Sequence, residues 1–152
     1  MLPVLIRTVY TDLKSGKIEN KVVLPAMLIG LIIDYAVGGR EAVLAGVKMG
    51  LLITALLYIL FFIGGLGAGD IKLLAVIGVL FPGEIISITA VAFILAGIWS
   101  AGMIVIRMIK KEKMLIKGET IHFSIPIAVA FITVMILNYK GLLIKSLFMK
   151  SV

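Results

Sequence analysis

The chain of 152 residues contains no cysteine and a single histidine, His122. Without cysteine it can form no disulfide framework, no zinc ribbon and no cysteine nucleophile. With one histidine, a multi-histidine metal site cannot be built from this chain alone. Its glycine-rich run also lacks the Gly-Lys-Ser/Thr ending of a phosphate-binding loop. The sequence therefore excludes several common classes of metal, thiol and nucleotide chemistry.

Apolar side chains are abundant instead. They fill 62% of the positions, and the mean hydropathy is +1.23. A soluble domain is about half apolar, so this composition predicts a membrane protein. The length allows one compact bundle, which we expect to be a single integral-membrane domain over residues 1–152. The net charge of +7 comes from basic residues between hydrophobic runs. Membrane topology and lipid headgroups explain this pattern better than nucleic acid does.

The hydrophobic segments predict an all-α polytopic membrane helix bundle. Five segments are candidates for entering the bilayer: 22–37, 42–63, 70–81, 85–106 and 123–139. A sixth apolar stretch at 2–10 is too short to cross, because a crossing needs roughly 20 apolar residues. The sequence thus predicts about six helices, the first of them incomplete.

Basic residues orient the predicted bundle. They cluster at Lys14, Lys17 and Lys21 and again over 107–117, and cytoplasmic loops carry such an excess. If the spans alternate, both clusters share a face with the glycine run before Asp70. We therefore expect a multi-pass protein of the cytoplasmic membrane with this face in the cytoplasm. The lysines after the last span disagree with this orientation, and we interpret them as an interfacial amphipathic tail.

Two acids lie where apolar segments begin or end. Asp70 follows three closely spaced glycines in the run Gly-Leu-Gly-Ala-Gly-Asp-Ile-Lys at 65–72, and Asp12 is in a similar setting near the N-terminus. An ionisable residue at a membrane-embedded position is costly and so points to function. Aspartate is also a favoured helix cap, which is the structural alternative for each acid alone.

A pair of carboxylates can hydrolyse a peptide bond without a metal or an organic cofactor. One carboxylate acts as the base toward water while the other, protonated, polarises the carbonyl group. Two close carboxylates cannot both ionise cheaply, so they share a proton. The paired aspartates therefore predict an intramembrane aspartyl protease with no cofactor.

The flanking residues resemble the type IV prepilin peptidase family. The stretch Asp12-Leu-Lys-Ser-Gly-Lys-Ile-Glu-Asn20 is similar to its first catalytic segment: Asp, five variable residues, then Ile-Pro-Asn. Gly67-Ala-Gly69-Asp70-Ile-Lys72 matches its Gly-x-Gly-Asp-x-Lys signature at every specified position. A looser likeness is present at 121–126, where a proline enters the last helix. The resemblance covers roughly residues 9 to 135.

The resemblance implies both the activity and the site. Such enzymes cut the short basic leader of prepilins and pseudopilins on the cytoplasmic side, just before the hydrophobic helix. Carried over by motif, Asp12 and Asp70 are the catalytic pair, and Gly67 and Gly69 shape the loop. Lys72 either pairs with a carboxylate, positions substrate or has a purely structural role.

The chain departs from the family pattern in three informative ways. The first is the incomplete first helix, which bears on the positioning of Asp12. Glu19 stands where the family usually has proline, so the turn after Asp12 is expected to be looser. The cysteine-bearing cytoplasmic domain of longer members is missing, so methylation of the mature pilin is not expected. This short form is similar to peptidases of tight-adherence pili and to archaeal preflagellin peptidases. The alternatives are a preflagellin-type signal peptidase and a proton-coupled or non-catalytic membrane protein; the client and the oligomeric state stay open.

Overall fold

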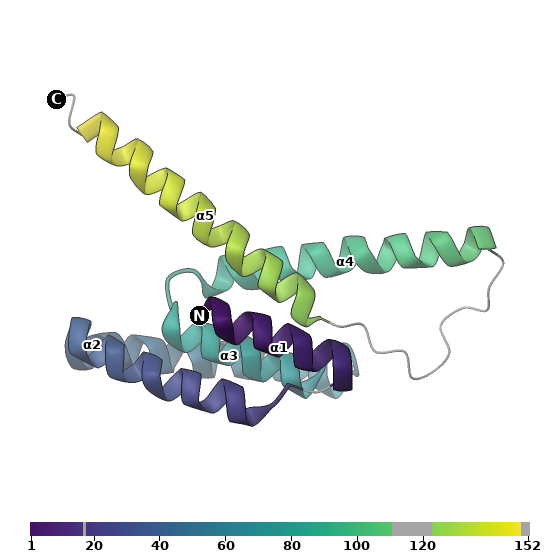
Figure 1. Ribbon diagram of the computed structural model, residues 1–152, viewed down its shortest axis with the longest axis horizontal. Coiled ribbons are helices and arrows are strands. Elements are labelled where there is room, and N and C mark those ends of the chain that lie inside the picture. Colours follow the sequence, from purple (N-terminus) through teal and green to yellow (C-terminus); the bar gives the residue numbers. More distant parts are fainter. Residues whose placement is uncertain (17, 111–122, 150–152) are drawn as a thin grey trace.

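The computed structural model describes residues 1–16, 18–110 and 123–149. All regular secondary structure in this part of the chain is helical, which confirms the predicted all-α class. Figure 1 shows the five helices, which are α1 (Leu2–Ser15), α2 (Asn20–Phe62), α3 (Ala68–Leu80), α4 (Ile85–Lys110) and α5 (Ser124–Met149).

The long helix α2 is a hairpin of two helical arms. The break lies at Gly39, whose φ of 63° and ψ of −156° lie in a region that essentially only glycine adopts. Figure 1 shows α2 reversing direction at one end of the molecule. The predicted segments 22–37 and 42–63 leave a loop over 38–41 between them, and in the structure this loop is reduced to the single residue at the break. When the two arms of α2 are counted separately, the described part of the chain has six helical segments, and the sequence predicted about six.

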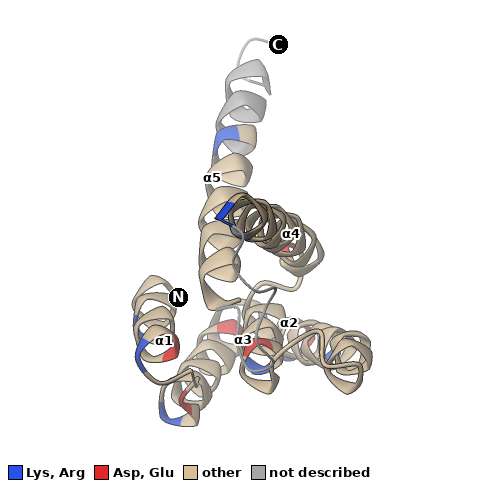
Figure 2. Ribbon diagram, turned by 90° about the vertical axis from the view of Figure 1, so that its right-hand side faces the viewer, with Lys and Arg blue, Asp and Glu red and all other residues tan. Residues whose placement is uncertain are grey.

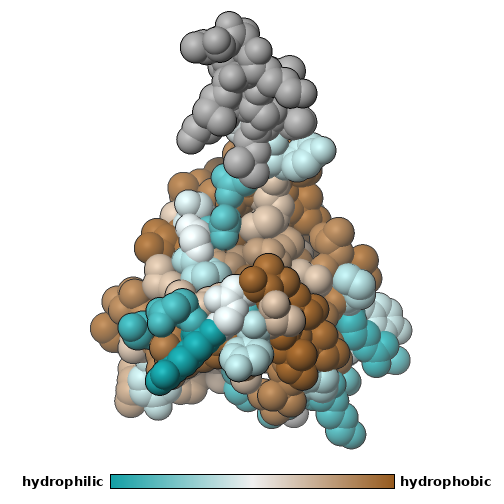
Figure 3. Space-filling model, turned by 90° about the vertical axis from the view of Figure 1, so that its left-hand side faces the viewer, coloured by the Kyte–Doolittle hydropathy of each residue, from teal (hydrophilic) through white to brown (hydrophobic). Residues whose placement is uncertain are grey.

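Three of the helices are long and apolar enough to cross a membrane: α2, α4 and the first 18 residues of α5. Their outward faces carry large apolar side chains, such as Ile32, Ile98 and Leu137, each more than 60% exposed. Figure 3 shows brown, hydrophobic surface over much of one end of the molecule, and Figure 2 shows long stretches of α4 and α5 without charge. Such surfaces suit lipid rather than water, so the protein is a membrane protein.

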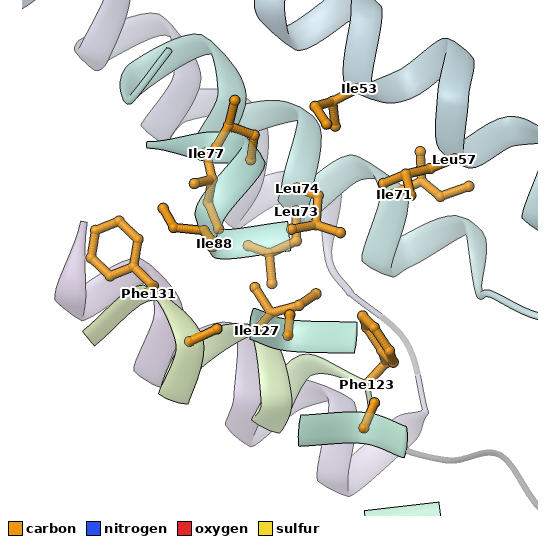
Figure 4. Packing of buried hydrophobic residues seen from close by; sticks show 14 of the residues in the cluster. Ile53, Leu57, Ile71, Leu73, Leu74, Ile77, Ile88, Phe123, Ile127 and Phe131 are labelled. Carbon is orange, nitrogen blue, oxygen red and sulfur yellow. The ribbon is translucent and has the colours of Figure 1, made fainter. Parts of the chain in front are cut away.

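Helix α3 forms the centre of the bundle. Its 13 residues span only about 20 Å, which is shorter than the hydrocarbon core of a bilayer. Leu73, Leu74 and Ile77 are fully buried, and α2, α4 and α5 all pack against the helix. Figure 4 shows Leu73 and Leu74 between Ile53 of α2 and Ile127 of α5. A helix that is apolar on all sides is typically enclosed by other helices, and α3 follows this rule.

Glycines allow α2 and α3 to approach backbone to backbone. A Cβ atom built on Gly46 would overlap the carbonyl oxygen of Val79, and one on Gly50 would lie 3.1 Å from the carbonyl oxygen of Ala75. Small residues at such positions let two helices in a membrane come into close contact. This packing fixes α3, and with it Asp70, against the second arm of α2.

The helices alternate in direction along the long axis of the body. Figure 1 shows the end of α1 and the starts of α2, α3 and α5 toward the same end of the molecule. The polar motifs of the sequence therefore gather at one end.

Candidate active site

Asp12 lies in the last turn of α1. Gly16 ends the helix in the left-handed conformation, at φ 63°, and its N–H donates to the carbonyl oxygen of Asp12 at 2.7 Å. The Asp12 side chain is buried, at 8% exposure. Its Oδ2 accepts a hydrogen bond from the hydroxyl of Ser124, at the start of α5, over 2.6 Å. The end of α1 thus presents a buried carboxylate toward α5.

A glycine turn leads from α2 into α3. Gly64 has a φ of 75°, its N–H donates to the carbonyl oxygen of Phe61, and the N–H of Gly65 donates to that of Leu60. This pair of bonds is the Schellman arrangement, which needs a left-handed residue after the helix. Leu66 then inserts into the core at 6% exposure and anchors the turn.

Asp70 lies in the first turn of α3 and is 9% exposed. The N-cap residue, Gly67, is extended, with φ −77° and ψ 145°. A Cβ atom at this glycine would lie 2.9 Å from Oδ2 of Asp70, so glycine leaves room for the carboxylate. The first turn of a helix also favours a negative charge. The Gly-x-Gly-Asp spacing therefore has a local physical reason.

The structure packs the two motif segments against each other. A Cβ atom on Gly69 would lie 3.1 Å from Cβ of Ile18, so the isoleucine lies directly over the glycine. The Nζ of Lys72 donates to Oδ1 of Asn20 over 3.2 Å, between residues 52 positions apart. The segment that follows Asp12 thus lies on the segment that contains Asp70.

Two features of this region were not predicted from the sequence. One is the Lys72–Asn20 hydrogen bond, since the motif names both residues without pairing them. The other is Ser124, a fully buried polar residue at the start of an apolar helix. A buried hydroxyl needs a partner, but the sequence carries no sign that Ser124 is buried, so only the structure identifies it. His122, Lys17 and the basic residues of 111–117 lie outside the described part of the chain.

The surroundings of the site are polar but offer no cluster of metal ligands. An open hollow lined by Glu19, Asn20 and Lys21 adjoins the Lys72–Asn20 contact. Among the residues that the structure describes, no group of three or more histidine, aspartate or glutamate side chains could hold a metal ion. The chemically notable groups here are therefore the two buried carboxylates and the polar residues that surround them.

Comparison with known proteins identifies the family. The model of the type IV leader peptidase family matches residues 1–105, which include α1, α2, α3 and both aspartate motifs. No curated protein and no solved structure matches the chain. The family match covers more than half of the 152 residues. The chain therefore belongs to the type IV leader peptidase family and is a leader peptidase-like membrane protease.

Proposed function

We propose that this protein is an intramembrane aspartyl endopeptidase that removes the basic leader peptide of prepilin-like or pseudopilin proteins. Asp12 and Asp70 are its catalytic pair. The observation that carries the proposal is the contact between the two motif segments, through Ile18 on Gly69 and through Lys72 and Asn20. Such packing is what a two-carboxylate site contributed by distant parts of the chain requires.

The burial of both carboxylates supports this chemistry. Asp12 and Asp70 are each at least nine-tenths buried. In hydrolysis, one carboxylate takes a proton from the attacking water, while the protonated partner donates a hydrogen bond to the scissile carbonyl oxygen. During attack the partner's proton passes to the carbonyl oxygen, which gives a neutral gem-diol and leaves the negative charge on the partner carboxylate. When the gem-diol collapses, the proton taken from water passes to the leaving amine and the gem-diol returns a proton to the partner carboxylate. A site shielded from bulk water strengthens each of these interactions.

The charge at this end of the bundle supports a cytoplasmic site. Four helix termini toward the same end of the molecule carry lysine (Figures 1 and 2). They are the ends of α1 and α4, with Lys14 and Lys110, and the starts of α2 and α3, with Lys21 and Lys72. Cytoplasmic ends of membrane helices carry an excess of lysine and arginine. A leader that precedes a hydrophobic helix would meet the site at this membrane face.

The test is cleavage of leader-bearing substrates by the purified protein in detergent or liposomes. Prepilin, pseudopilin and preflagellin substrates are compared, and the cut is located by mass spectrometry of both products. We expect one cut between the basic leader and the hydrophobic helix. A protein that binds these substrates but cuts none of them would favour a non-catalytic role. Proton uptake into liposomes without any cleavage would favour the proton-coupled alternative.

Lys72 provides a second prediction, because its bond to Asn20 suggests that it positions the turn after Asp12. Replacing Lys72 with methionine removes one exposed hydrogen bond, and we expect cleavage to fall about three- to fivefold. If Lys72 acts through Asn20, the Asn20→Ala variant and the double variant should each lose the same factor in cleavage rate as Lys72→Met. A double-mutant cycle measures this coupling.

Lys21→Met is the matched control, since Lys21 lines the hollow beside Asn20 but is not the donor in the bond that Lys72 makes to Asn20. We expect this variant to cleave like the wild type. A much larger loss in Lys72→Met than in Asn20→Ala would instead show that Lys72 contacts the substrate.

A further inference from the structure

A serine from the last helix meets the candidate catalytic carboxylate of the first. Ser124 opens α5 and is fully buried. Its hydroxyl donates to Oδ2 of Asp12 over 2.6 Å, across 112 positions of sequence. A buried hydroxyl without an acceptor is costly, and hydrogen bonds to a carboxylate are stronger than neutral ones. The contact therefore constrains both partners.

The backbone that carries Ser124 is anchored on both sides. The ring of Phe123 packs against that of Phe93 in α4, with centroids 5.1 Å apart. Ile127 is fully buried in the core, as Figure 4 shows. Pro126 lies in the first turn of α5, where its missing N–H leaves no helical hydrogen bond unmade. The hydroxyl therefore reaches Asp12 from a well-defined position.

The other buried hydroxyls near Asp12 are used differently. Thr8 donates to the carbonyl oxygen of Val4 at 2.7 Å, and Thr11 donates to that of Thr8 at 3.0 Å. Both bonds stay within α1 and do not involve the carboxylate. Thr8 is thus a buried hydroxyl on the same helix as Asp12 that donates to the main chain of that helix, and it provides a matched control.

We propose that Ser124 is a positioning residue that fixes the orientation of the Asp12 carboxylate toward the reacting water. This inference rests on the proposed peptidase function. Ser124 lies beyond residues 1–105, so the family match assigns it no role. Because small misplacements of a catalytic group cost up to about a hundredfold in rate, a single anchoring bond can matter for turnover.

Removing the hydroxyl with Ser124→Ala should lower kcat about tenfold and change KM less than about twofold, because the substrate still binds. Ser124→Cys keeps a weaker donor of similar size, and its kcat should lie between those of wild type and Ser124→Ala. Thr8→Val, the control, should keep kcat, KM and the thermal midpoint. Steady-state kinetics in detergent and thermal unfolding of the same samples measure these quantities.

A second readout does not depend on any substrate. A hydrophobic carbodiimide modifies membrane-embedded carboxyl groups, and peptide mass spectrometry gives the extent of modification at each acid. Without the hydroxyl of residue 124, Asp12 should be modified several-fold faster in Ser124→Ala than in wild type or Thr8→Val. Asp34 of α2 serves as the internal reference in each sample.

The outcomes separate the two proposals. If wild type cuts no leader yet Ser124→Ala accelerates modification of Asp12, the peptidase function fails and the anchoring by Ser124 stands. A kcat for Ser124→Ala within about twofold of wild type overturns the positioning role. A kcat that falls together with the thermal midpoint, without a change in Asp12 modification, also overturns it and assigns Ser124 to packing alone.

Discussion

Asparagine in place of Asp70 is expected to lower the rate of leader cleavage by a factor of about 1000 or more, and asparagine in place of Asp12 by a similar factor. Asparagine has nearly the same size as aspartate, so both variants should fold. It can neither take a proton from water nor present an acidic O–H to the carbonyl group. Because the two carboxylates work as a unit, either loss should abolish most of the rate enhancement. The measurement is the initial rate of cleavage by each purified variant.

Asp34→Asn is the control for both variants. Asp34 is a half-buried acid on α2, outside the two motifs. We expect the Asp34→Asn variant to cleave at a rate within about twofold of wild type, since substitutions away from a site have small effects. Comparable thermal midpoints for the asparagine variants of Asp12, Asp70 and Asp34 would show that the losses in cleavage rate do not come from unfolding. Retention of about a tenth of the wild-type rate in one asparagine variant would remove that residue from the catalytic pair.

The largest effect on stability is expected from a single methyl group at Gly46. In Gly46→Ala the new Cβ would overlap the main-chain carbonyl oxygen of Val79. Main-chain atoms cannot rotate away as a side chain can, so the second arm of α2 and α3 must separate. Overpacking of this kind costs about 3 kcal/mol and should lower the thermal midpoint in detergent by several degrees.

Gly97→Ala makes the same chemical change where there is space. Gly97 lies in α4, and a Cβ atom there would meet no heavy atom within 4 Å. Alanine is the better helix former by about 1 kcal/mol, so the midpoint should stay constant or rise. If Gly46→Ala and Gly97→Ala lowered the thermal midpoint equally, the close approach of the two helices at Gly46 would not be what stabilises the bundle. Cleavage by Gly46→Ala should fall as well, because α3 carries Asp70.

Much of the fold and the identity of the candidate residues could be predicted from the sequence. Long apolar runs leave few alternatives to a helical membrane bundle, and acids such as Asp12 and Asp70 are conspicuous in them. The glycines before Asp70 also follow a recognisable spacing that has a local physical cause, since Gly67 leaves room for the Asp70 carboxylate. By contrast, the predicted loop at Gly38–Glu41 was too long, because one glycine at φ 63° reverses the chain without a loop.

The contacts that complete the site could not be predicted in this way. Serine is common in membrane helices, and nothing local distinguishes Ser124 until α5 is packed against α1. The pairing of Lys72 with Asn20 and the packing of Ile18 on Gly69 likewise depend on how distant segments meet. A sequence pattern indicates which residue types are present, whereas their partners are decided by helix packing.

The hydrogen bond between Asp12 and Ser124 has a consequence for biosynthesis. The ribosome adds about 5–20 residues per second, so the 112 positions between the two residues take on the order of ten seconds to make. During that interval α1 through α4 can enter the membrane while the serine does not yet exist. Insertion of α5 is therefore the step that completes the surroundings of Asp12, and a nascent chain arrested before it would hold both aspartates in an unfinished site.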